Sequence, residues 1–520
     1  MDRIRELLGR QVDASSLGLF RILWGILMVW ESIRKLPKVS GMYSPEYFHF
    51  TYPMFPFVKP FPEVWMMYTE VWIMITAAVL ITLGLFFRYA SAVFLFGYTH
   101  LFLIEKLYYN NHFYLTILIA FLMMVSCADV CYSIPWLLKR RQGIKANPTL
   151  PIWNLILLRG QVVVLYFFGG IAKLNSDWLQ GEPVRYWFAH KGPDHVFSPF
   201  IGEEWFVWMV CWTGLILDLT VGFFLLNRKF RLPAILVLIT FHTMNHFIFN
   251  IGLFPYIGIS LCLLFIDPDR PRIVFSWLAK HWFGWKETIL EKKPKAILNK
   301  KVAKPLPVHW SVAVFVCAYL AVQILWPLRT WFYRDNPSWT EVGHTFSWRM
   351  MLRHKDGFLQ FVFDPPEAER YLEQHPEILP KVGKAHVQRM VKNPHFILQY
   401  AHALSDSLEK NGVHDVKIRC ISVVSLNGRP YQVMIDPKTD LATASYGLLE
   451  VPDWILPLDK YRRAGQYPQN TKERQLAIRQ AIRDYAKTQR AVQQVPVRQV
   501  IHSEDDSKRV KFRKNNNVPQ

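Results

Sequence analysis

The sequence predicts a mainly α-helical polytopic membrane protein, with about nine transmembrane helices and a C-terminal, extracytoplasmic, β-rich α+β domain. Three observations predict this fold class. Hydrophobic residues make up 51% of the 520 residues and 15% are aromatic, although the last third of the chain is polar. Apolar stretches close to the roughly 20 residues that cross a bilayer recur along the first part of the chain. After residue 340, short stretches alternate between apolar and polar residues, as strands do.

The apolar stretches define the expected spans. They lie at residues 17–30, 65–87, 90–104, 113–130, 153–173, 204–226, 232–250, 251–266 and 308–326. Several are short, so we expect them to be tilted or partly interfacial. Residues 1–330 are then a transmembrane domain, residues 331–460 an extracytoplasmic β-rich domain, and residues 461–520 a basic tail that is partly helical and partly disordered.

The charged loops predict the orientation. Basic clusters occur at residues 3–10, 139–145, 228–231 and 267–304 and at Arg88. With nine spans, all five clusters lie on the same side, which the positive-inside rule makes cytoplasmic together with the N-terminus. The net charge of +21 fits loops facing anionic lipid. We expect no nucleic-acid partner, because no binding module is recognisable, and no cleavable signal peptide.

The C-terminal part carries strand and helix signals. Residues 358–363, 416–424 and 431–435 alternate with period two, and Asn427-Gly428 is a hairpin turn signal between the last two strands. Residues 366–411 have helical periodicity, and residues 470–491 predict a solvated helix. The polar stretch after this helix predicts disorder.

Polar groups gather near the outer ends of three predicted spans. Lys173 ends one span, Asn111 and His112 begin another, and His242 and Asn245 lie in the outer half of a third. Ionisable groups are costly inside a membrane, so a cluster of them indicates a functional site. Lys173 alone could be an interfacial anchor. In a partly desolvated pocket a lysine can act as a base near neutral pH, and a histidine can orient it or relay the proton.

Metal and disulfide chemistry find little support in the sequence. His242 and His246 have the i,i+4 spacing of a shared metal site, but a membrane di-iron oxygenase would need several such histidine motifs. We therefore expect no metal. Among the six cysteines, only Cys420 lies in the polar domain, which excludes a disulfide within that domain.

Several ungapped motifs occur in one order and together resemble the vitamin K-dependent gamma-glutamyl carboxylase family. The resemblance covers about residues 15–455 and is that of a shortened, bacterial-type homologue with the horizontally transferred transmembrane domain. The motifs are Asn110-Asn111-His112-Phe113-Tyr114-Leu115, Pro151-Ile152-Trp153-Asn154 with Leu158-Arg159-Gly160-Gln161, Tyr166 to Trp178 (YFFGGIAKLNSDW), Phe241-His242-Thr243-Met244-Asn245 with Ile251-Gly252-Leu253-Phe254, and Phe346-Ser347-Trp348-Arg349-Met350-Met351.

The resemblance implies an enzyme that couples oxygenation of reduced vitamin K to its epoxide with carboxylation of peptide glutamate, using O2 and CO2. It implies that Lys173 is the base that deprotonates the hydroquinone and that His112 assists it. By the same resemblance, the quinone pocket includes Asn111, Arg159, His242 and Asn245. The glutamate-peptide side includes Trp348, Arg349 and Met351.

The resemblance also implies partners and a location. The partners are a glutamate-containing peptide or protein, membrane lipid, and a quinone reductase that recycles the epoxide. The implied location is the bacterial inner membrane, or otherwise the endoplasmic reticulum membrane.

The sequence departs from the family pattern at three positions. Ala172 stands where the first of two adjacent lysines is common, Arg349 where an aspartate often follows the tryptophan, and Arg353 where a histidine is usual. The last two departures keep a second reading open, a quinol epoxidase or oxidase that does not carboxylate protein. A third reading is a transporter or scaffold that has kept the fold without catalysis.

Overall fold

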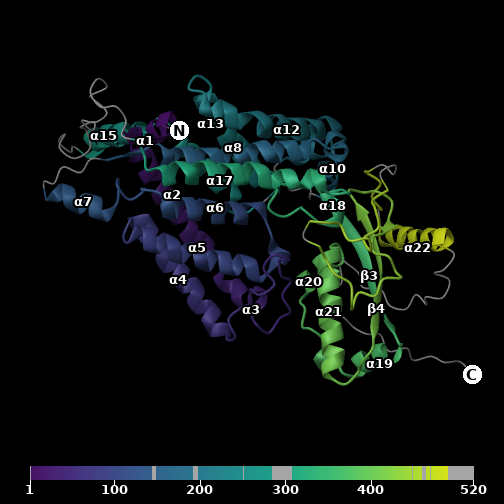
Figure 1. Cartoon of the computed structure of the whole chain (residues 1–520). Helices are drawn as coiled ribbons and strands as arrows, with labels where there is room; N and C mark the ends of the chain where they lie inside the picture. The colour runs from purple at the N-terminus through teal and green to yellow at the C-terminus, as the bar shows by residue number, and fades with distance from the viewer. Residues whose placement is uncertain are drawn as a thin grey trace, which may run out of the picture.

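The computed structural model describes residues 2–142, 148–190, 197–249, 251–283, 307–447, 449–459, 464–468 and 470–489. Figure 1 shows a bundle of long helices with a small sheet and its helices at one end. We refer to residues 2–332 as the helical bundle and to residues 355–489 as the sheet domain. The segment between them includes the helix α18 (Pro337–Thr340) and residues 346–352, which we call the linking strip.

Each predicted span overlaps an apolar helix, although the spans predicted at 65–87, 113–130 and 251–266 extend beyond the helices observed there. The helices of the bundle are α2 (Ser15–Ile33), α4 (Val64–Leu83), α5 (Phe87–Ile104), α6 (Asn111–Val125), α8 (Trp153–Lys173), α12 (Glu204–Leu226), α13 (Arg231–Phe249), α14 (Phe254–Leu261) and α17 (Trp310–Leu328). Within the described residues, seven helices are long and apolar enough to cross a membrane. The apolar helices at Asn111–Val125 and Phe254–Leu264 are shorter than a full span.

Large apolar side chains on the outside of the bundle show that it is built for lipid. In water such a surface would be unusual, because soluble proteins rarely expose large contiguous apolar patches. Exposed examples from five helices are Trp72, Phe96, Trp212, Leu236 and Leu325. Together with the helix lengths, this surface confirms an integral membrane protein.

Arg21 shows how the bundle accommodates a charge inside an apolar helix. Its side chain is fully buried in α2, and its guanidinium donates to the backbone oxygens of Ile81 and Thr82, each at 2.8 Å. These carbonyls belong to the last turn of α4, where few backbone donors remain for the helix oxygens. Gly84 ends α4 with φ of 67°, and a Cβ there would lie 2.6 Å from the Arg21 guanidinium.

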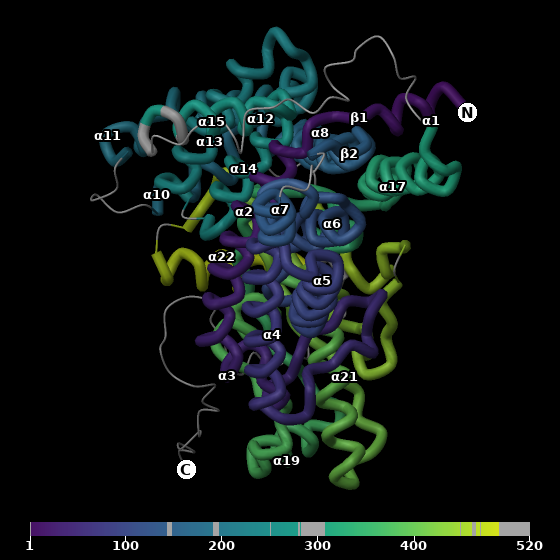
Figure 2. The backbone as a smooth tube through the Cα atoms, turned by 90° about the vertical axis from the view of Figure 1, so that its left-hand side faces the viewer, coloured from purple at the N-terminus to yellow at the C-terminus, as the bar shows by residue number. Residues whose placement is uncertain are grey.

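Short helices and strands surround the ends of the bundle. They are α1 (Asp2–Gly9), α3 (Val39–Met42), α7 (Ile134–Arg141), α9 (Ser176–Leu179), α10 (Val184–Ala189), α11 (Ser198–Ile201), α15 (Arg270–Phe283), β1 (Gln11–Asp13) and β2 (Thr149–Pro151). The basic helices α7 and α15 lie with α1 at the end opposite the sheet domain (Figure 1). Figure 2 views the molecule from that side and shows β1 and β2 beside α8. This antiparallel pair, with Val12 opposite Leu150, was not predicted from the sequence.

The sheet domain confirms the predicted hairpin. Its strands are β3 (Lys355–Asp364), β4 (Lys417–Leu426) and β5 (Gln432–Val433), in the antiparallel order β3-β4-β5. Between β4 and β5, Asn427 and Gly428 have φ of 51° and 70° and form a tight turn in which the backbone nitrogen of Arg429 donates to the oxygen of Leu426 at 3.1 Å. The predicted helical stretch contains α19 (Glu367–Gln374), α20 (Lys384–Met390) and α21 (Pro394–Lys410).

The last described helix, α22 (Thr471–Gln489), corrects one expectation. The sequence predicted a solvated helix, but one side of α22 packs against the sheet. Ile478 and Ala481 are buried in a cluster with Phe358 and Val423. The sequence predicted the helix, but the apolar residues on its packed side, Ala477, Ile478, Ala481, Ile482 and Tyr485, stand among many charged residues and did not indicate its packing.

The bundle and the sheet domain share a core. Phe50 and Leu107, from loops of the bundle, are buried in the hydrophobic cluster of the sheet domain. The Gln399 side chain pairs with the backbone of Thr51, with both hydrogen bonds at 2.9 Å. The two parts are therefore packed together over the end of the bundle that carries Lys173.

Candidate active site

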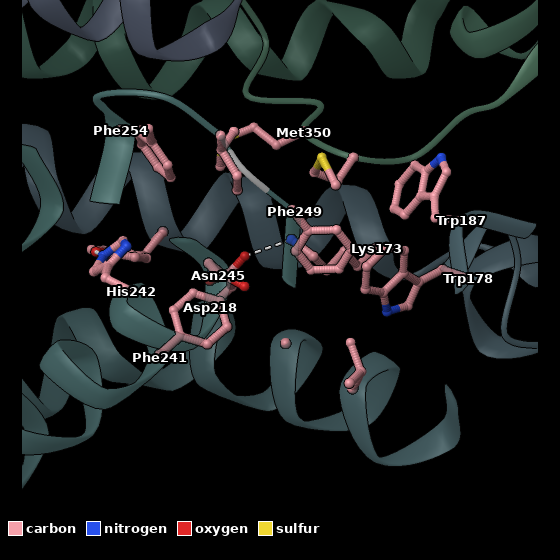
Figure 3. A pocket seen from close by; sticks show the side chains of 15 residues that line it. Lys173, Trp178, Trp187, Asp218, Phe241, His242, Asn245, Phe249, Phe254 and Met350 are labelled. Atoms are coloured by element: carbon pink, nitrogen blue, oxygen red, sulfur yellow. Dashed lines mark hydrogen bonds and ion pairs between the residues drawn. The ribbon is translucent and has the colours of Figure 1, made fainter. Parts of the chain in front are cut away.

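A cavity of about 80 Å³ lies where α8, α12 and α13 meet the linking strip. Figure 3 shows Lys173 and Asp218 in its middle, with His242 and Phe254 on one side and Trp178 and Trp187 on the other. The cavity is mostly apolar, with a few polar groups that converge on it, as is typical of sites for small ligands. Its lining residues are Tyr166, Lys173, Trp178, Trp187, Val210, Gly214, Asp218, Phe241, His242, Asn245, Phe249, Ile251, Phe254, Met350 and Met351.

Lys173, the last residue of α8, forms a buried ion pair with Asp218 of α12. The lysine is 6% exposed and the aspartate 4%, and Nζ lies 2.6 Å from Oδ2. Nζ also donates to the backbone oxygen of Gly169 at 3.3 Å and lies 5.3 Å from the Trp178 ring centroid. A snorkelling anchor would extend its ammonium towards water. The observed side chain instead points into the cavity, which excludes the anchor reading.

The pair exists because α8 and α12 approach each other very closely. A Cβ on Gly170 would lie 2.7 Å from the backbone nitrogen of Leu219, and a Cβ on Gly169 would lie 3.3 Å from Asp218 Oδ2. Any other residue at position 170 would push the helices apart. The two glycines of the motif therefore set the distance between the lysine and the aspartate.

His242 forms the second polar contact of the cavity. It is fully buried in α13, and its Nε2 lies 2.7 Å from the hydroxyl of Tyr166. Its Nδ1 has no partner among the described residues. Gly258 of α14 makes room for this ring, because a Cβ there would lie 2.2 Å from Nε2. Asn245, three residues further along α13, also lines the cavity.

The linking strip closes the cavity from the side of the sheet domain. Met350 and Met351 line it, and Met351 has φ of 55°. The preceding Trp348 is fully buried, with its ring 4.9 Å from that of Tyr114, and does not line the cavity. Arg349 also lies outside the lining, with its Nη2 3.4 Å from the Ser338 hydroxyl. Of the three residues expected on the peptide side, the structure thus brings only Met351 to the cavity.

His112 and Asn111 lie behind the cavity wall and do not line it. The His112 ring is 6.0 Å from that of Phe254, and the His242 ring contacts Phe254 at 5.6 Å. Phe254 therefore contacts both histidines. Asn111 donates to the backbone oxygen of Arg349 at 3.1 Å, so it fixes the linking strip to the start of α6.

Arg159 lies far from the cavity, although the resemblance implied a place in the quinone pocket. It precedes Lys173 by fourteen residues in the same helix, a distance of about 21 Å along the axis. Its Nε donates to the backbone oxygen of Leu264 at 2.7 Å. Arg159 therefore supplies a hydrogen-bond donor to a free carbonyl at the end of a neighbouring helical segment.

Two residues of the site were missed by sequence reasoning. Asp218 is an acid within a 23-residue apolar helix, and the rule that singled out Lys173 applies to it equally. Tyr166 belongs to the same motif as Lys173, but nothing in the sequence indicates that its hydroxyl faces His242 in another helix. The sequence therefore contained a signal that could have identified Asp218, but none that could have identified Tyr166.

A charged cluster lies beside the linking strip. Glu341 pairs with Arg353 and, at 2.6 Å, with Lys355. Burial alone would raise the pKa of Glu341, but the Arg353 and Lys355 cations hold it well below its ordinary value. Burial lowers the pKa of Lys355 to about 8 and that of Arg349 to about 10. Arg353 and Lys355 share the Glu341 carboxylate and Arg349 lies within its electrostatic reach, so positive charge is in excess in this cluster.

The fold and the cavity define a polytopic membrane protein with a buried lysine at the end facing an attached sheet domain. Residues 9–270 match the HTTM domain family, and residues 309–461 match the lumenal domain of the vitamin K-dependent gamma-carboxylase. The chain belongs to the vitamin K-dependent gamma-carboxylase family. No solved structure matches the chain significantly.

Proposed function

We propose that this protein oxygenates reduced vitamin K to its epoxide and uses that reaction to carboxylate glutamate in a peptide. Lys173 is the base in this proposal. The observation that carries it is the buried Lys173–Asp218 pair in a cavity lined by aromatic side chains. Buried ionisable groups in such cavities are characteristic of catalytic sites.

The cavity suits a hydroquinone by its chemistry. A hydroquinone presents an apolar ring system with two hydroxyl groups. Aromatic side chains would pack against the rings, while Lys173, Asn245 and the unpartnered Nδ1 of His242 could bond the hydroxyls. His112 and Asn111 would support the cavity indirectly: His112 contacts Phe254, and Asn111 bonds to the linking strip. We do not extend this pocket to Arg159, which is bonded elsewhere.

Lys173 would accept the proton of a hydroquinone hydroxyl at Nζ. Only the neutral amine can do so, whereas the ion pair with Asp218 favours the ammonium. Moving one proton from Nζ to Oδ2 gives a neutral amine and a neutral acid, and apolar surroundings lower the free-energy cost of that uncharged pair relative to the ion pair. Asp218 would thus hold the proton that frees Lys173. When bound, reduced vitamin K supplies, with O2, the strong base that removes the glutamate proton before CO2 adds.

The aromatic walls would keep water away from that chemistry. Trp178, Trp187 and Phe249 border the lysine end of the cavity. A strong base would otherwise take a proton from water, so exclusion of water protects the coupling.

The peptide would approach from the sheet domain. Met351 lines the cavity, and the electropositive cluster around Glu341 lies beside the same strip. Surplus positive charge favours a substrate that carries carboxylates. Trp348 and Arg349 would support this face from behind. In this arrangement the sheet domain lies outside the cytoplasm, and a quinone reductase recycles the epoxide.

Replacement of Lys173 tests the proposal. In protein reconstituted in nanodiscs, Lys173→Ala should lower the rate of epoxide formation about 10²- to 10⁴-fold, as loss of a general base does. Lys381→Ala, at an exposed position, is the matched control and should have no effect. Unchanged quinol oxidation in Lys173→Ala would exclude Lys173 as the base. Absence of quinol oxidation in the unmodified protein would favour a transporter or scaffold.

One observation favours a second candidate, a quinol epoxidase that does not carboxylate protein. Arg349, which departs from the family pattern, lies outside the cavity lining and contacts Ser338 instead. The peptide side therefore differs most from expectation. Epoxide formed without incorporation of labelled CO2 into glutamate peptides would establish this second candidate.

A further inference from the structure

Asp177 joins the end of α8 to the sheet domain. It lies in α9, four residues after Lys173, and is 5% exposed. Its Oδ2 accepts from Arg429 Nη1 at 2.6 Å and from Asn427 Nδ2 at 2.8 Å, while its Oδ1 accepts from Arg429 Nη2 at 2.5 Å. The arginine and the carboxylate thus form a bidentate, buried pair across the boundary between bundle and sheet domain.

Asn427 connects the same point to the linking strip. Its Nδ2 also donates to the backbone oxygen of Leu352 at 3.2 Å, and its Oδ1 accepts from the backbone nitrogen of His354 at 2.7 Å. Leu352 directly follows Met350 and Met351, which line the cavity. A single amide therefore touches both the segment after Lys173 and the segment that forms the opposite wall.

The hairpin turn that carries Asn427 is itself held on its outer side. Gly465 donates to the backbone oxygen of Asn427 at 2.8 Å, and Gln466 donates to that of Gly428 at 2.6 Å. A Cβ on Gly428 would lie 2.7 Å from the ring of Tyr467. The Tyr467 hydroxyl donates to Glu182 Oε2 at 2.7 Å. The turn is therefore fixed between the sheet domain and the loop that follows α9.

The segment between Lys173 and Asp177 is stiff enough to transmit a position. Asn175 donates from its backbone to the oxygen of Lys173 at 2.8 Å and from its side chain to that of Ala172 at 2.9 Å. Its Oδ1 accepts from the backbone nitrogen of Trp178 at 3.0 Å. Trp178 in turn lies over the Lys173 ammonium. A shift of Asp177 would therefore move both the lysine and its aromatic cover.

We propose that Asp177, Asn427 and Arg429 are positioning residues for the cavity, and we call them the clamp. The clamp sets the distance between the Lys173 end of α8 and the Met350–Met351 wall. It acts through the backbone and touches neither substrate nor reacting atoms. Its catalytic consequence rests on the proposed function of Lys173, whereas its effect on the position of Lys173 does not.

The test uses the full chain in nanodiscs with Arg429→Gln, Asp177→Asn, Arg429→Lys and the Gln/Asn double variant. Mass spectrometry measures how fast an amine-reactive reagent modifies Lys173. Quinol oxidation gives kcat and KM. Because misplacement by about 1 Å can cost 10²-fold in rate, we expect Arg429→Gln to lower kcat 10- to 100-fold with a smaller change in KM. Labelling of Lys173 should rise severalfold.

The other variants separate positioning from general damage. The double variant should lose no more kcat than Arg429→Gln alone, because both changes remove the same interaction. Arg429→Lys keeps the charge but loses the bidentate geometry, so an intermediate kcat is expected. The matched controls are Lys381→Gln and Glu46→Gln, which remove an exposed pair that also joins the two parts at 3.0 Å. Neither control should change labelling.

Unchanged Lys173 labelling and kcat in folded Arg429→Gln would overturn the proposal, as would losses that simply add in the double variant. If Arg429→Gln does not fold, the near-isosteric Asp177→Asn decides the same question. If the unmodified protein fails to oxidise quinol, the proposed function fails, and the labelling rates alone then decide whether the clamp positions Lys173.

Discussion

At the scale of single residues, the site is defined by a charge pair inside an apolar bundle. The sequence singled out Lys173, His242 and Asn245, and the structure places all three around one cavity. The sequence did not predict that Asp218 is the partner of Lys173, because this pairing depends on how the two helices cross. The cost of an unpaired charge in a membrane nevertheless implies that some partner exists.

Asp218→Asn tests whether the aspartate holds the proton that frees the lysine. The amide keeps the shape but cannot take a proton from Nζ, so we expect epoxide formation to fall about 10²-fold. Glu204→Gln, which removes an exposed acid from the same helix, is the control and should leave the rate unchanged. A variant as fast as the unmodified protein would show that Asp218 only anchors the ammonium.

At the scale of elements, period and length predicted the helices of the bundle and the β4–β5 hairpin correctly. Apolar stretches near the length of a span have few alternatives to helix, and Asn-Gly is a strong turn signal. The pairing of β1 with β2 was not predicted, because three-residue strands carry almost no periodic signal. The crossing of α8 and α12 was not predicted either, although Gly169-Gly170 allows it.

Gly170→Ala tests the importance of that crossing. The new Cβ would lie 2.7 Å from the Leu219 backbone, so we expect a loss of about 1–3 kcal/mol in the free energy of unfolding and a lower kcat. Gly41→Ala is the control, because no atom lies within 4 Å of its Cβ position. Thermal unfolding in a fixed detergent measures the first effect. An unchanged melting temperature would mean that the helices can separate without cost.

At the scale of the whole molecule, the proposed function depends on an interface that joins segments about 250 residues apart. The contact of Asp177 with Asn427 and Arg429 could not be predicted from one sequence, because no local pattern pairs such distant positions. The packing of α22 on the sheet was not predicted either, because it also joins segments that are far apart in the sequence. Propensity and periodicity describe elements, whereas the docking of one element on another depends on the shapes of both.

We expect His354 to make this interface sensitive to pH. Its ring stacks on Tyr186 at 3.6 Å, and burial, helped by Lys392, lowers its pKa to about 4. Asp356 opposes this shift and His190 adds to it. Because the unfolded chain takes up the proton first, the stability is fully present above pH 6.5 and is lost as the pH falls towards 4.

Comparison with His354→Phe isolates this effect. The shift corresponds to about 3 kcal/mol, as an order of magnitude. Phenylalanine keeps the stacking on Tyr186 but cannot titrate, so the variant should lose less stability than the unmodified protein between pH 6.5 and 4. Thermal unfolding across this range measures the difference. Parallel pH profiles for the two proteins would exclude a role for His354.

The central claim is that Lys173 serves a vitamin K oxygenation that is coupled to carboxylation. The most direct measurement incubates the purified, reconstituted protein with reduced vitamin K, O2, labelled CO2 and a glutamate-containing peptide, and quantifies epoxide and labelled peptide together. We expect both products from the unmodified protein and neither from Lys173→Ala. Equal amounts of both products from the two proteins would contradict the account.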